Sequence, residues 1–238
     1  VTIYYISIMD PTTLTKTSFC GKLVNNITNN ESKKFILNSL SMNCNNIKYN
    51  SKYAKLFNIK YVNNLNNSHI ICVKTSGTPY FMYCSQINNV NYTFLIDKKI
   101  KEGYEYPKIF VLDYNFNSEL FKGTLFEVEL LRDNNNEWFI IIADIYFYKS
   151  QNYKNINTID RINKIHDILT NEYKYNHTDI CSLEIKKYFD YKDKDELFKE
   201  FIPSLNYRCR GIYFVPINTR HQKILYLFKE NEFVYKIK

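Results

Sequence analysis

Short apolar stretches separated by turn residues dominate the chain from residue 69 to residue 148. Runs of about four to eight residues rich in Ile, Val, Tyr and Phe are typical of strands when turn residues bound them. Runs that follow one another this closely predict antiparallel hairpins. The predicted strands cover residues 69–74, 80–84, 91–97, 109–113, 124–131 and 138–148, with turns at 87–90 and 132–136.

The periodicity becomes helical after residue 157. Isoleucines recur at helical spacing from Ile159 to Ile168, which predicts an amphipathic helix over residues 158–172. A second helix is expected over residues 193–201, because Pro203 would stop it. The other expected elements are a short helix at 33–40, polar loops at 25–30 and 43–50, and strands at 211–216 and 224–228.

No linker, repeat or low-complexity stretch divides the chain. We therefore expect one domain over residues 1–238, of the α+β class, with antiparallel sheets and flanking helices. Within it, residues 66–230 would form the core. Residues 1–65 would be an N-terminal segment whose role is open.

The composition supports a globular fold and limits the partners. Hydrophobic residues make up 45% and aromatic residues 17% of the chain, which is typical of a packed, β-rich domain. The net charge of +8 favours polyanions such as nucleic acid or nucleotides, and is equally compatible with solubility alone. The heavy use of Asn, Lys, Ile and Tyr favours an AT-rich genome, such as that of a large DNA virus or a protozoan parasite.

The cysteines and the apolar runs limit the compartment. The six cysteines show no paired spacing and no zinc pattern, so buried free thiols are expected. No apolar stretch reaches the roughly 18 residues that span a bilayer. We therefore expect a protein of a reducing, cytoplasmic compartment with no membrane partner.

The most distinctive polar motif lies between two predicted strands and reads Lys-Thr-Ser-Gly over residues 74–77. A lysine at a strand end, followed by a glycine turn, can aim its amine at a phosphate. The chain has only five glycines, and Gly77, Gly123 and Gly211 all border strand-like runs that carry acids or bases. Glycine this scarce is expected where backbone geometry demands it.

Taken in order, these runs resemble the covalent nucleotidyltransferase superfamily, most closely the guanylyltransferase domain of mRNA capping enzymes. The first motif of that family, Lys-x-Asp-Gly-x-Arg, reads Lys-Thr-Ser-Gly-Thr-Pro over residues 74–79. Lys74 and Gly77 therefore match, whereas Ser76 and Pro79 replace the acid and the arginine. The third motif is matched by Phe-Glu-Val-Glu-Leu over residues 126–130.

The later motifs follow in the family order. The apolar strand at 138–147 carries Asp144, and a helix with Arg161 follows it. The fourth motif reads Arg-Gly-Ile-Tyr-Phe over 210–214, with arginine in place of the acid, and the fifth is Tyr-Leu-Phe-Lys over 226–229. The segment 196–214 also resembles snurportin, a cap-binding relative without nucleotidyl-transfer activity. Because the chain ends just past the fifth motif, no C-terminal OB barrel is expected.

The resemblance implies a two-step reaction. Lys74 would attack the α-phosphate of GTP and form a covalent lysine–GMP, which then passes GMP to the 5′-diphosphate end of an RNA. A lysine works this way only when burial or neighbouring cations lower its pKa. The position of Lys74 between apolar strands suits this requirement.

The resemblance also implies the nucleotide and metal contacts. Glu129 would contact the ribose, Arg210 and Lys229 the phosphates, and Tyr146 or Phe147 would stack on the base. Asp144 is the candidate ligand for a divalent metal, Mg²⁺ or Mn²⁺, which an active enzyme would use.

Each of these side chains also has a purely structural interpretation. Lys74 and Glu129 could be solvated strand residues, and Arg210 could belong to a basic surface patch. Asp144 lies within an apolar strand, so it is expected to be buried and paired. Aromatic residues such as Phe147 more often pack in a core than stack on a base.

Three functions remain open from the sequence. The kept Lys74 and Gly77 favour a divergent guanylyltransferase-like domain of a capping apparatus, binding GTP and the RNA 5′ end. The changes at Ser76 and Arg210, with the missing barrel, favour a catalytically inactive module that binds a cap, nucleotide or RNA, or docks on another capping or transcription subunit. An unrelated α+β protein is the third. ATP also stays open as the nucleotide, because ligases of the superfamily use it at the same lysine.

Overall fold

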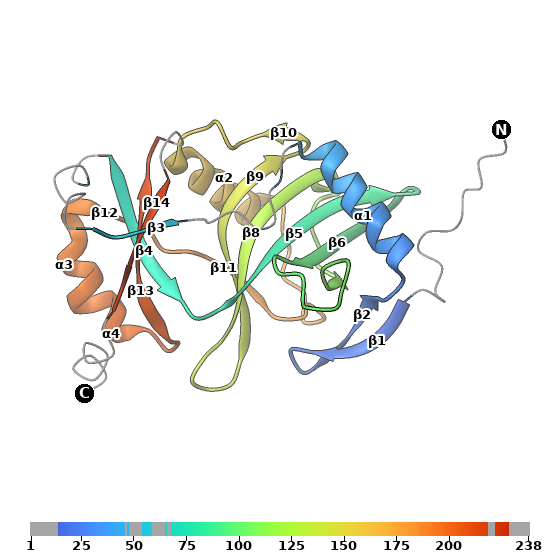
Figure 1. The fold of residues 1–238 in the computed structure, drawn as a ribbon, viewed down its shortest axis with the longest axis horizontal. Coiled ribbons are helices and arrows are strands. Elements are labelled where there is room, and N and C mark those ends of the chain that lie inside the picture. Colours follow the sequence, from blue (N-terminus) through green and yellow to red (C-terminus); the bar gives the residue numbers. More distant parts are fainter. Residues whose placement is uncertain are drawn as a thin grey trace.

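The computed structural model describes residues 14–45, 47, 54–58, 65, 68–218 and 222–228. Two mostly antiparallel sheets, here called sheet A and sheet B, lie side by side with helices packed on their faces (Figure 1). The α+β class with antiparallel sheets and flanking helices, expected from the sequence, is therefore confirmed.

Sheet A contains the predicted hairpins and has its strands in the order β1-β2-β7-β6-β5-β8-β9-β10, with β11 pairing in parallel with β9. Residues 88 and 89 turn with positive φ between β5 and β6, as a two-residue hairpin turn requires. The described strands are β1 (Leu14–Phe19), β2 (Lys22–Ile27), β5 (Thr78–Ile87), β6 (Val90–Asp97), β7 (Ile109–Leu112), β8 (Lys122–Arg132), β9 (Trp138–Tyr148), β10 (Gln151–Asn152) and β11 (Ser182–Ile185).

Sheet B has the order β12-β4-β13-β14-β3. The chain passes from β4 in sheet B to β5 in sheet A through Ser76 and Gly77, so the two sheets meet at this bend. A Cβ on Gly77 would lie 2.9 Å from the carbonyl oxygen of Leu130, which explains why glycine is required there. The strands of sheet B are β3 (Ala54–Leu56), β4 (His69–Thr75), β12 (Phe189–Asp190), β13 (Cys209–Pro216) and β14 (Lys223–Leu227).

Two helices cover opposite faces of sheet A. On one face, Ile36 of α1 (Asn30–Asn43) packs in a hydrophobic cluster with Phe81 of β5. On the other face, Ile165 of α2 (Thr158–Asn171) packs in a cluster with Met82. Neighbouring residues of a strand point to opposite faces, so β5 supplies both clusters. The predicted helices at 33–40 and 158–172 are confirmed.

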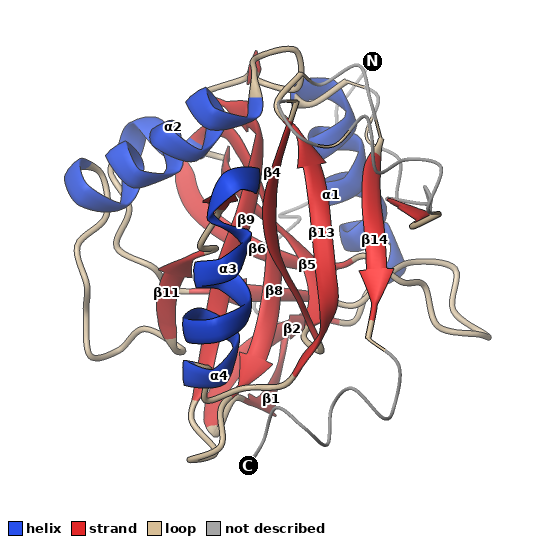
Figure 2. Cartoon of the chain, turned by 90° about the vertical axis from the view of Figure 1, so that its left-hand side faces the viewer, coloured by secondary structure: helices blue, strands red, loops and turns tan. Residues whose placement is uncertain are grey.

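A third helical segment covers the outer face of sheet B (Figure 2). A 3₁₀ turn η4 (Tyr191–Asp193) leads into α3 (Lys194–Glu196), a π-helical turn η5 (Leu197–Phe201) and α4 (Ile202–Ser204). This helix was predicted over 193–201, and it continues past Pro203 instead of stopping before it. The proline lies in the first turn of α4, a position that a helix tolerates. A short 3₁₀ helix, η3 (Ser118–Phe121), precedes β8.

The prediction of a polar loop over residues 25–30 is wrong. Asn25 and Asn26 lie in β2, and Asn30 begins α1. Only Val24 and Ile27 of β2 are fully buried, so this strand at one side of sheet A carries a weak apolar pattern. Of the loop expected over 43–50, Asn43 ends α1, and residues 46 and 48–50 lie outside the described residues.

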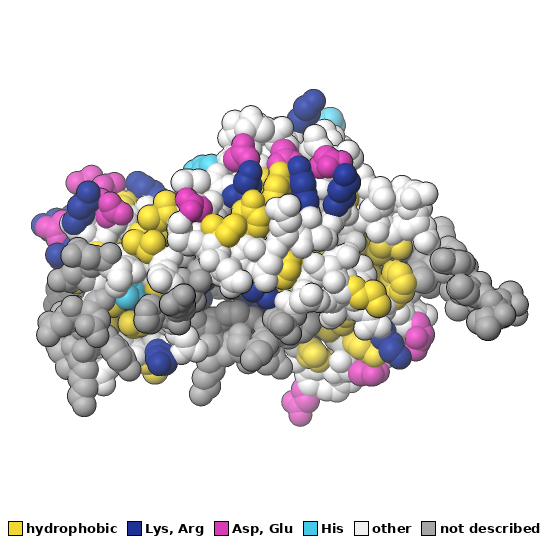
Figure 3. All heavy atoms as spheres, turned by 90° about the horizontal axis from the view of Figure 1, so that it is seen from above, with side chains coloured by type: hydrophobic (Ala, Val, Ile, Leu, Met, Phe, Trp, Pro, Cys, Tyr) yellow, Lys and Arg dark blue, Asp and Glu magenta, His cyan; other side chains and the backbone are white. Residues whose placement is uncertain are grey.

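The surface shows no single charged region on the face seen from above. Figure 3 shows acidic and basic side chains interspersed there, rather than one continuous basic patch. Within the described part of the chain, no helix is both long and apolar enough to cross a membrane. All six cysteines are described and all are free thiols; four are buried as expected, whereas Cys20 and Cys181 are only partly buried.

Candidate nucleotide site

Lys74 lies near the end of β4, beside the bend that joins the two sheets. Its Nζ donates a hydrogen bond of 2.7 Å to the carbonyl oxygen of Thr75. Burial lowers the pKa of Lys74; the charge of Glu129 opposes this shift, whereas the charges of Lys186 and Arg210 add to it. A lowered pKa increases the share of neutral amine, which is the nucleophilic form.

The fourth motif lies directly beside the first because β13 pairs with β4. Gly211 is opposite Lys74, and Arg210 is the extra residue of a β-bulge at this point. A Cβ on Gly211 would collide with the carbonyl oxygen of Tyr226 in β14, so only glycine fits there. Bulges often re-aim side chains next to active sites. The bulge thus brings an exposed arginine next to Lys74.

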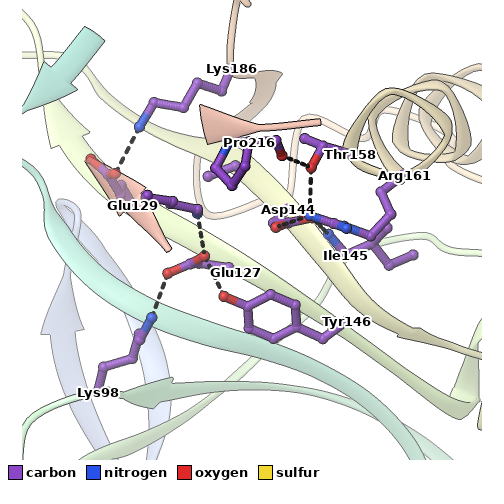
Figure 4. A network of polar contacts seen from close by, with 12 residues as sticks. Lys98, Glu127, Glu129, Asp144, Ile145, Tyr146, Thr158, Arg161, Lys186 and Pro216 are labelled. Carbon is purple, nitrogen blue, oxygen red and sulfur yellow. Dashed lines mark hydrogen bonds and ion pairs between the residues drawn. The ribbon is translucent and has the colours of Figure 1, made fainter. Parts of the chain in front are cut away.

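Glu129 of β8 connects the two sheets beside Lys74. Its carboxylate accepts a hydrogen bond from the hydroxyl of Thr75 in sheet B. It also accepts a hydrogen bond of 2.8 Å from Nζ of Lys186, which follows β11 and is buried (Figure 4). Glu129 and the bulge that carries Arg210 therefore both lie beside the end of β4 that carries Lys74.

Glu127 lies on the same face of β8, two residues before Glu129, and contacts a second group of polar side chains. It accepts hydrogen bonds of 2.5 Å from Lys98 and from the Tyr146 hydroxyl, and Lys223 of sheet B lies 3.4 Å away. Burial alone would raise the pKa of Glu127, but the charges of Lys223 and Lys98 outweigh burial and lower it. Glu127 is therefore a largely buried carboxylate, with 12% of its side chain exposed, that holds two lysines in place.

Asp144 of β9 forms a buried ion pair with Arg161 of α2. Nε of Arg161 lies 2.7 Å from one carboxylate oxygen and its Nη2 lies 3.0 Å from the other, and the Ile145 N–H also donates to this carboxylate. The hydroxyl of Thr158 in α2 accepts a hydrogen bond from the same guanidinium and donates one to the carbonyl oxygen of Pro216 in β13. Asp144 thereby anchors α2 between the two sheets. This agrees with the expectation that Asp144 is buried and paired.

The described residues do not fit a metal site made of protein ligands alone. Both oxygens of Asp144 are held by Arg161, and Glu127 and Glu129 each bind lysines. Within the described part of the chain, no group of three His, Cys, Asp or Glu side chains could hold a metal ion. A metal at Asp144 would have to displace the guanidinium, which differs from the expected role of this residue as a metal ligand.

The aromatic candidates have different surroundings. Tyr146 directs its hydroxyl to Glu127, within the polar network. Phe147 is 3% exposed and packs in the hydrophobic cluster of sheet A and α1. This packing differs from the open ring face that base stacking needs. Lys229, expected at the phosphates, lies outside the described residues.

Four residues of this network are not among the site residues predicted from the sequence. They are Glu127, Lys98, Lys186 and Lys223. Lys98 and Lys186 each follow the last residue of a strand directly, and a charged residue there resembles an ordinary solvated strand end. Lys223 and Glu127 meet only because β14 and β8, which belong to different sheets, come together where the two sheets meet. A second charged residue follows both Lys98 and Lys186, so their sequence surroundings give no signal of burial.

A separate apolar cavity of about 410 Å³ lies on the outer face of sheet B. Ile71 of β4 contributes to its lining, and Lys74 points to the other face of the same strand, because strand residues three apart lie on opposite faces. The cavity is lined by Phe57, Ile71, Tyr191, Lys194, Phe198, Ile212, Phe214, Tyr226 and Phe228.

Comparison with known proteins identifies the family of the chain. The family model of the mRNA capping enzyme catalytic domain matches residues 54–238. This match spans more than half of the chain and includes Lys74, Glu129 and Arg210. The comparison with curated proteins found no match. The chain therefore belongs to the family of the mRNA capping enzyme catalytic domain.

Proposed function

We propose that this domain is a guanylyltransferase of mRNA capping, with Lys74 as its nucleophile. One observation carries the proposal. Lys74, Lys186 and Lys223 all lie near the buried carboxylates, and of these three only Lys74 has a lowered pKa. Burial lowers the pKa of all three, but direct ion pairs with Glu129 and Glu127 reverse this for Lys186 and Lys223.

The reaction uses this difference between the lysines. The neutral amine of Lys74 attacks the α-phosphorus of GTP, the bond to the β-phosphate oxygen breaks, and pyrophosphate leaves as the amine loses a proton. A terminal oxygen of the RNA 5′-diphosphate then attacks the same phosphorus, and the phosphorus–nitrogen bond breaks. The nearby charges of Lys186 and Arg210 would stabilise the negative charge of the phosphates in both steps.

The remaining contacts belong to the same proposal. Glu129 would contact the ribose, Tyr146 would lie against the base, and Lys229 would contact the phosphates. Mg²⁺ or Mn²⁺ stays a prediction for the transfer reaction. Magnesium is usually held by one or two carboxylates together with substrate phosphates, which does not demand a cage of protein ligands. The reducing cytoplasm stays the expected compartment.

Labelling with α-labelled GTP and divalent metal tests the proposal. An active domain acquires a label that is stable to alkali and labile to acid, as expected of a lysine phosphoramidate, and Lys74→Ala abolishes it. Lys199→Ala is a matched control, because Lys199 is an exposed lysine on the helix over the outer face of sheet B. Absence of label in the folded wild-type protein would contradict the proposal.

A catalytically inactive binding module is the second candidate, and two replacements favour it. Ser76 and Arg210 stand where the family motifs have acids. Such a module would bind a cap, a nucleotide or an RNA 5′ end, or another capping or transcription subunit, without forming an adduct. Binding of a cap analogue with no covalent label would support it.

A further inference from the structure

Two cations at the inter-sheet site have no carboxylate partner among the described residues. Arg210 is exposed, and the structure gives its guanidinium no ion pair or hydrogen bond within the described part of the chain. Among the described residues, the amine of Lys74 donates only to the carbonyl oxygen of Thr75. Arg210 adjoins Gly211, which pairs with Lys74, so the two cations come from neighbouring positions of adjacent strands, and the charge of Arg210 also lowers the pKa of Lys74. An anion is the natural ligand for such a pair.

The carboxylates of the site are already occupied. Glu127 binds Lys98 and Lys223, Glu129 binds Lys186, and Asp144 binds Arg161. Breaking such buried pairs is strongly unfavourable, because it leaves an uncompensated charge in the interior. A divalent cation that enters this site has no free carboxylate among the described residues to receive it.

We propose that Arg210, with Lys74, binds the phosphates of the nucleotide directly, so that nucleotide binding at this site does not require a divalent metal. The inference rests on the proposed function, because it concerns the substrate of that site. It concerns binding and leaves open what the transfer step needs.

The chemistry of arginine supports this assignment. A guanidinium is planar and always charged, and it can bind two phosphate oxygens at once through parallel N–H bonds. Arg210 is the bulge residue next to Gly211, and Gly211 pairs with Lys74, so the guanidinium belongs to the backbone position beside the proposed nucleophile.

The described side chains of the site also carry an excess of positive charge that suits the phosphates. The cations are Lys74, Lys98, Arg161, Lys186, Arg210 and Lys223, and the carboxylates are Glu127, Glu129 and Asp144. The ion pairs neutralise only part of this charge, and the remainder lies at Lys74 and its neighbours. A polyphosphate is therefore favoured at this place over a further cation.

Equilibrium binding of a fluorescent N-methylanthraniloyl α,β-methylene GTP analogue, which cannot transfer GMP to a lysine, to the full chain tests the inference. The dissociation constant is measured in EDTA and again in excess MgCl₂. We expect the two values to agree within about threefold. A loss of affinity of about tenfold or more in EDTA would overturn the inference and leave the transfer reaction intact.

Variants assign the effect to Arg210. Arg210→Gln should weaken metal-free binding by about tenfold or more, and Arg210→Lys should weaken it less, because it keeps the charge but loses the paired N–H geometry. Arg132→Gln is the matched control, since Arg132 is an exposed arginine at the end of β8. Unchanged binding by Arg210→Gln would overturn the inference.

The two proposals can fail separately. Metal-free binding without covalent label overturns the transferase and keeps the phosphate role of Arg210. Covalent label together with binding that needs Mg²⁺ supports the transferase and overturns the phosphate role of Arg210. Absence of binding in both buffers overturns both.

Discussion

At the scale of single residues, the site depends on which lysine lacks a direct carboxylate partner. Lys186 and Lys223 pair with Glu129 and Glu127, and their pKa values are raised. The amine of Lys74 donates to a backbone oxygen and lies over the face of a tyrosine ring, and its pKa is lowered. The same kind of side chain therefore serves as a fixed charge at two positions and as a candidate nucleophile at the third.

The pH dependence of covalent labelling follows from Lys74. Because its pKa lies below that of an ordinary lysine, the neutral amine forms at lower pH than usual. We expect the initial rate of labelling to rise with pH and to level off below pH 10.5, the ordinary value for lysine. Single-turnover labelling across a pH series measures this. A rate that still rises in proportion to hydroxide beyond that value would show that the pKa is not lowered.

Glu127 gives a second prediction at this scale. Glu127→Gln leaves Lys98 and Lys223 without a buried counter-charge, so it should lower the free energy of unfolding at pH 7 by about 3–5 kcal/mol. Because the folded-state pKa of Glu127 lies below 4.5, its stabilising effect is present above that pH and is lost as the pH falls further. The difference between wild type and variant should therefore shrink in acid.

Urea unfolding at several pH values measures this difference. Glu137→Gln changes an exposed glutamate in the β8–β9 hairpin and should leave the stability nearly unchanged. A constant difference between wild type and Glu127→Gln from neutral to acid pH would refute the assigned role of Glu127.

At the scale of elements, the hairpins were predictable and the contacts between elements were not. Strands β5, β6, β8 and β9 have strong apolar patterns, which the sequence displays directly. Strands β1 and β2 are mostly polar, because only a few of their side chains reach the core. The resemblance assigned residues 74, 129 and 210 to one site and the fold brings these three near one another, whereas Asp144 is paired with Arg161 and Phe147 lies in the core. The positions of Lys98, Lys186 and Lys223 depend on how strands from two sheets align, which periodicity does not encode.

The pairing of β4, β13 and β14 depends on Gly211. A Cβ there would collide with the carbonyl oxygen of Tyr226, so Gly211→Ala must push β14 away. We expect the free energy of unfolding to fall by about 1–3 kcal/mol. Arg210→Ala, at the exposed neighbour in the same bulge, should change it by about 0.5 kcal/mol or less. Equal stability of the two variants in urea unfolding would contradict the close approach of β13 and β14.

At the scale of the whole molecule, α2 and the ion pairs connect the two sheets. Asp144 of sheet A binds Arg161 of α2, and Thr158 of α2 binds the backbone of β13 in sheet B. Lys223 and Thr75 of sheet B contact Glu127 and Glu129 of sheet A. The geometry of the site therefore depends on both sheets holding their relative position.

The variant Asp144→Asn distinguishes a structural role of Asp144 from a metal-binding role. If it anchors α2, Asp144→Asn should lower the free energy of unfolding by about 3–5 kcal/mol, because Arg161 stays buried without its counter-charge. The variant that remains folded should still acquire label at Lys74, with an unchanged requirement for Mg²⁺. Urea unfolding and a metal titration of labelling measure the two effects. Unchanged stability with a greatly increased metal requirement would instead identify Asp144 as a metal ligand.

The position of the covalent adduct tests most directly whether Lys74 is the nucleophile. The protein is incubated with GTP and divalent metal, digested under alkaline conditions, and its peptides are mapped by mass spectrometry. We predict GMP on the peptide that contains Lys74, with the fragment ions placing it on that side chain. An adduct on Lys186, Lys223 or any other residue, or no adduct on the folded protein, would contradict it.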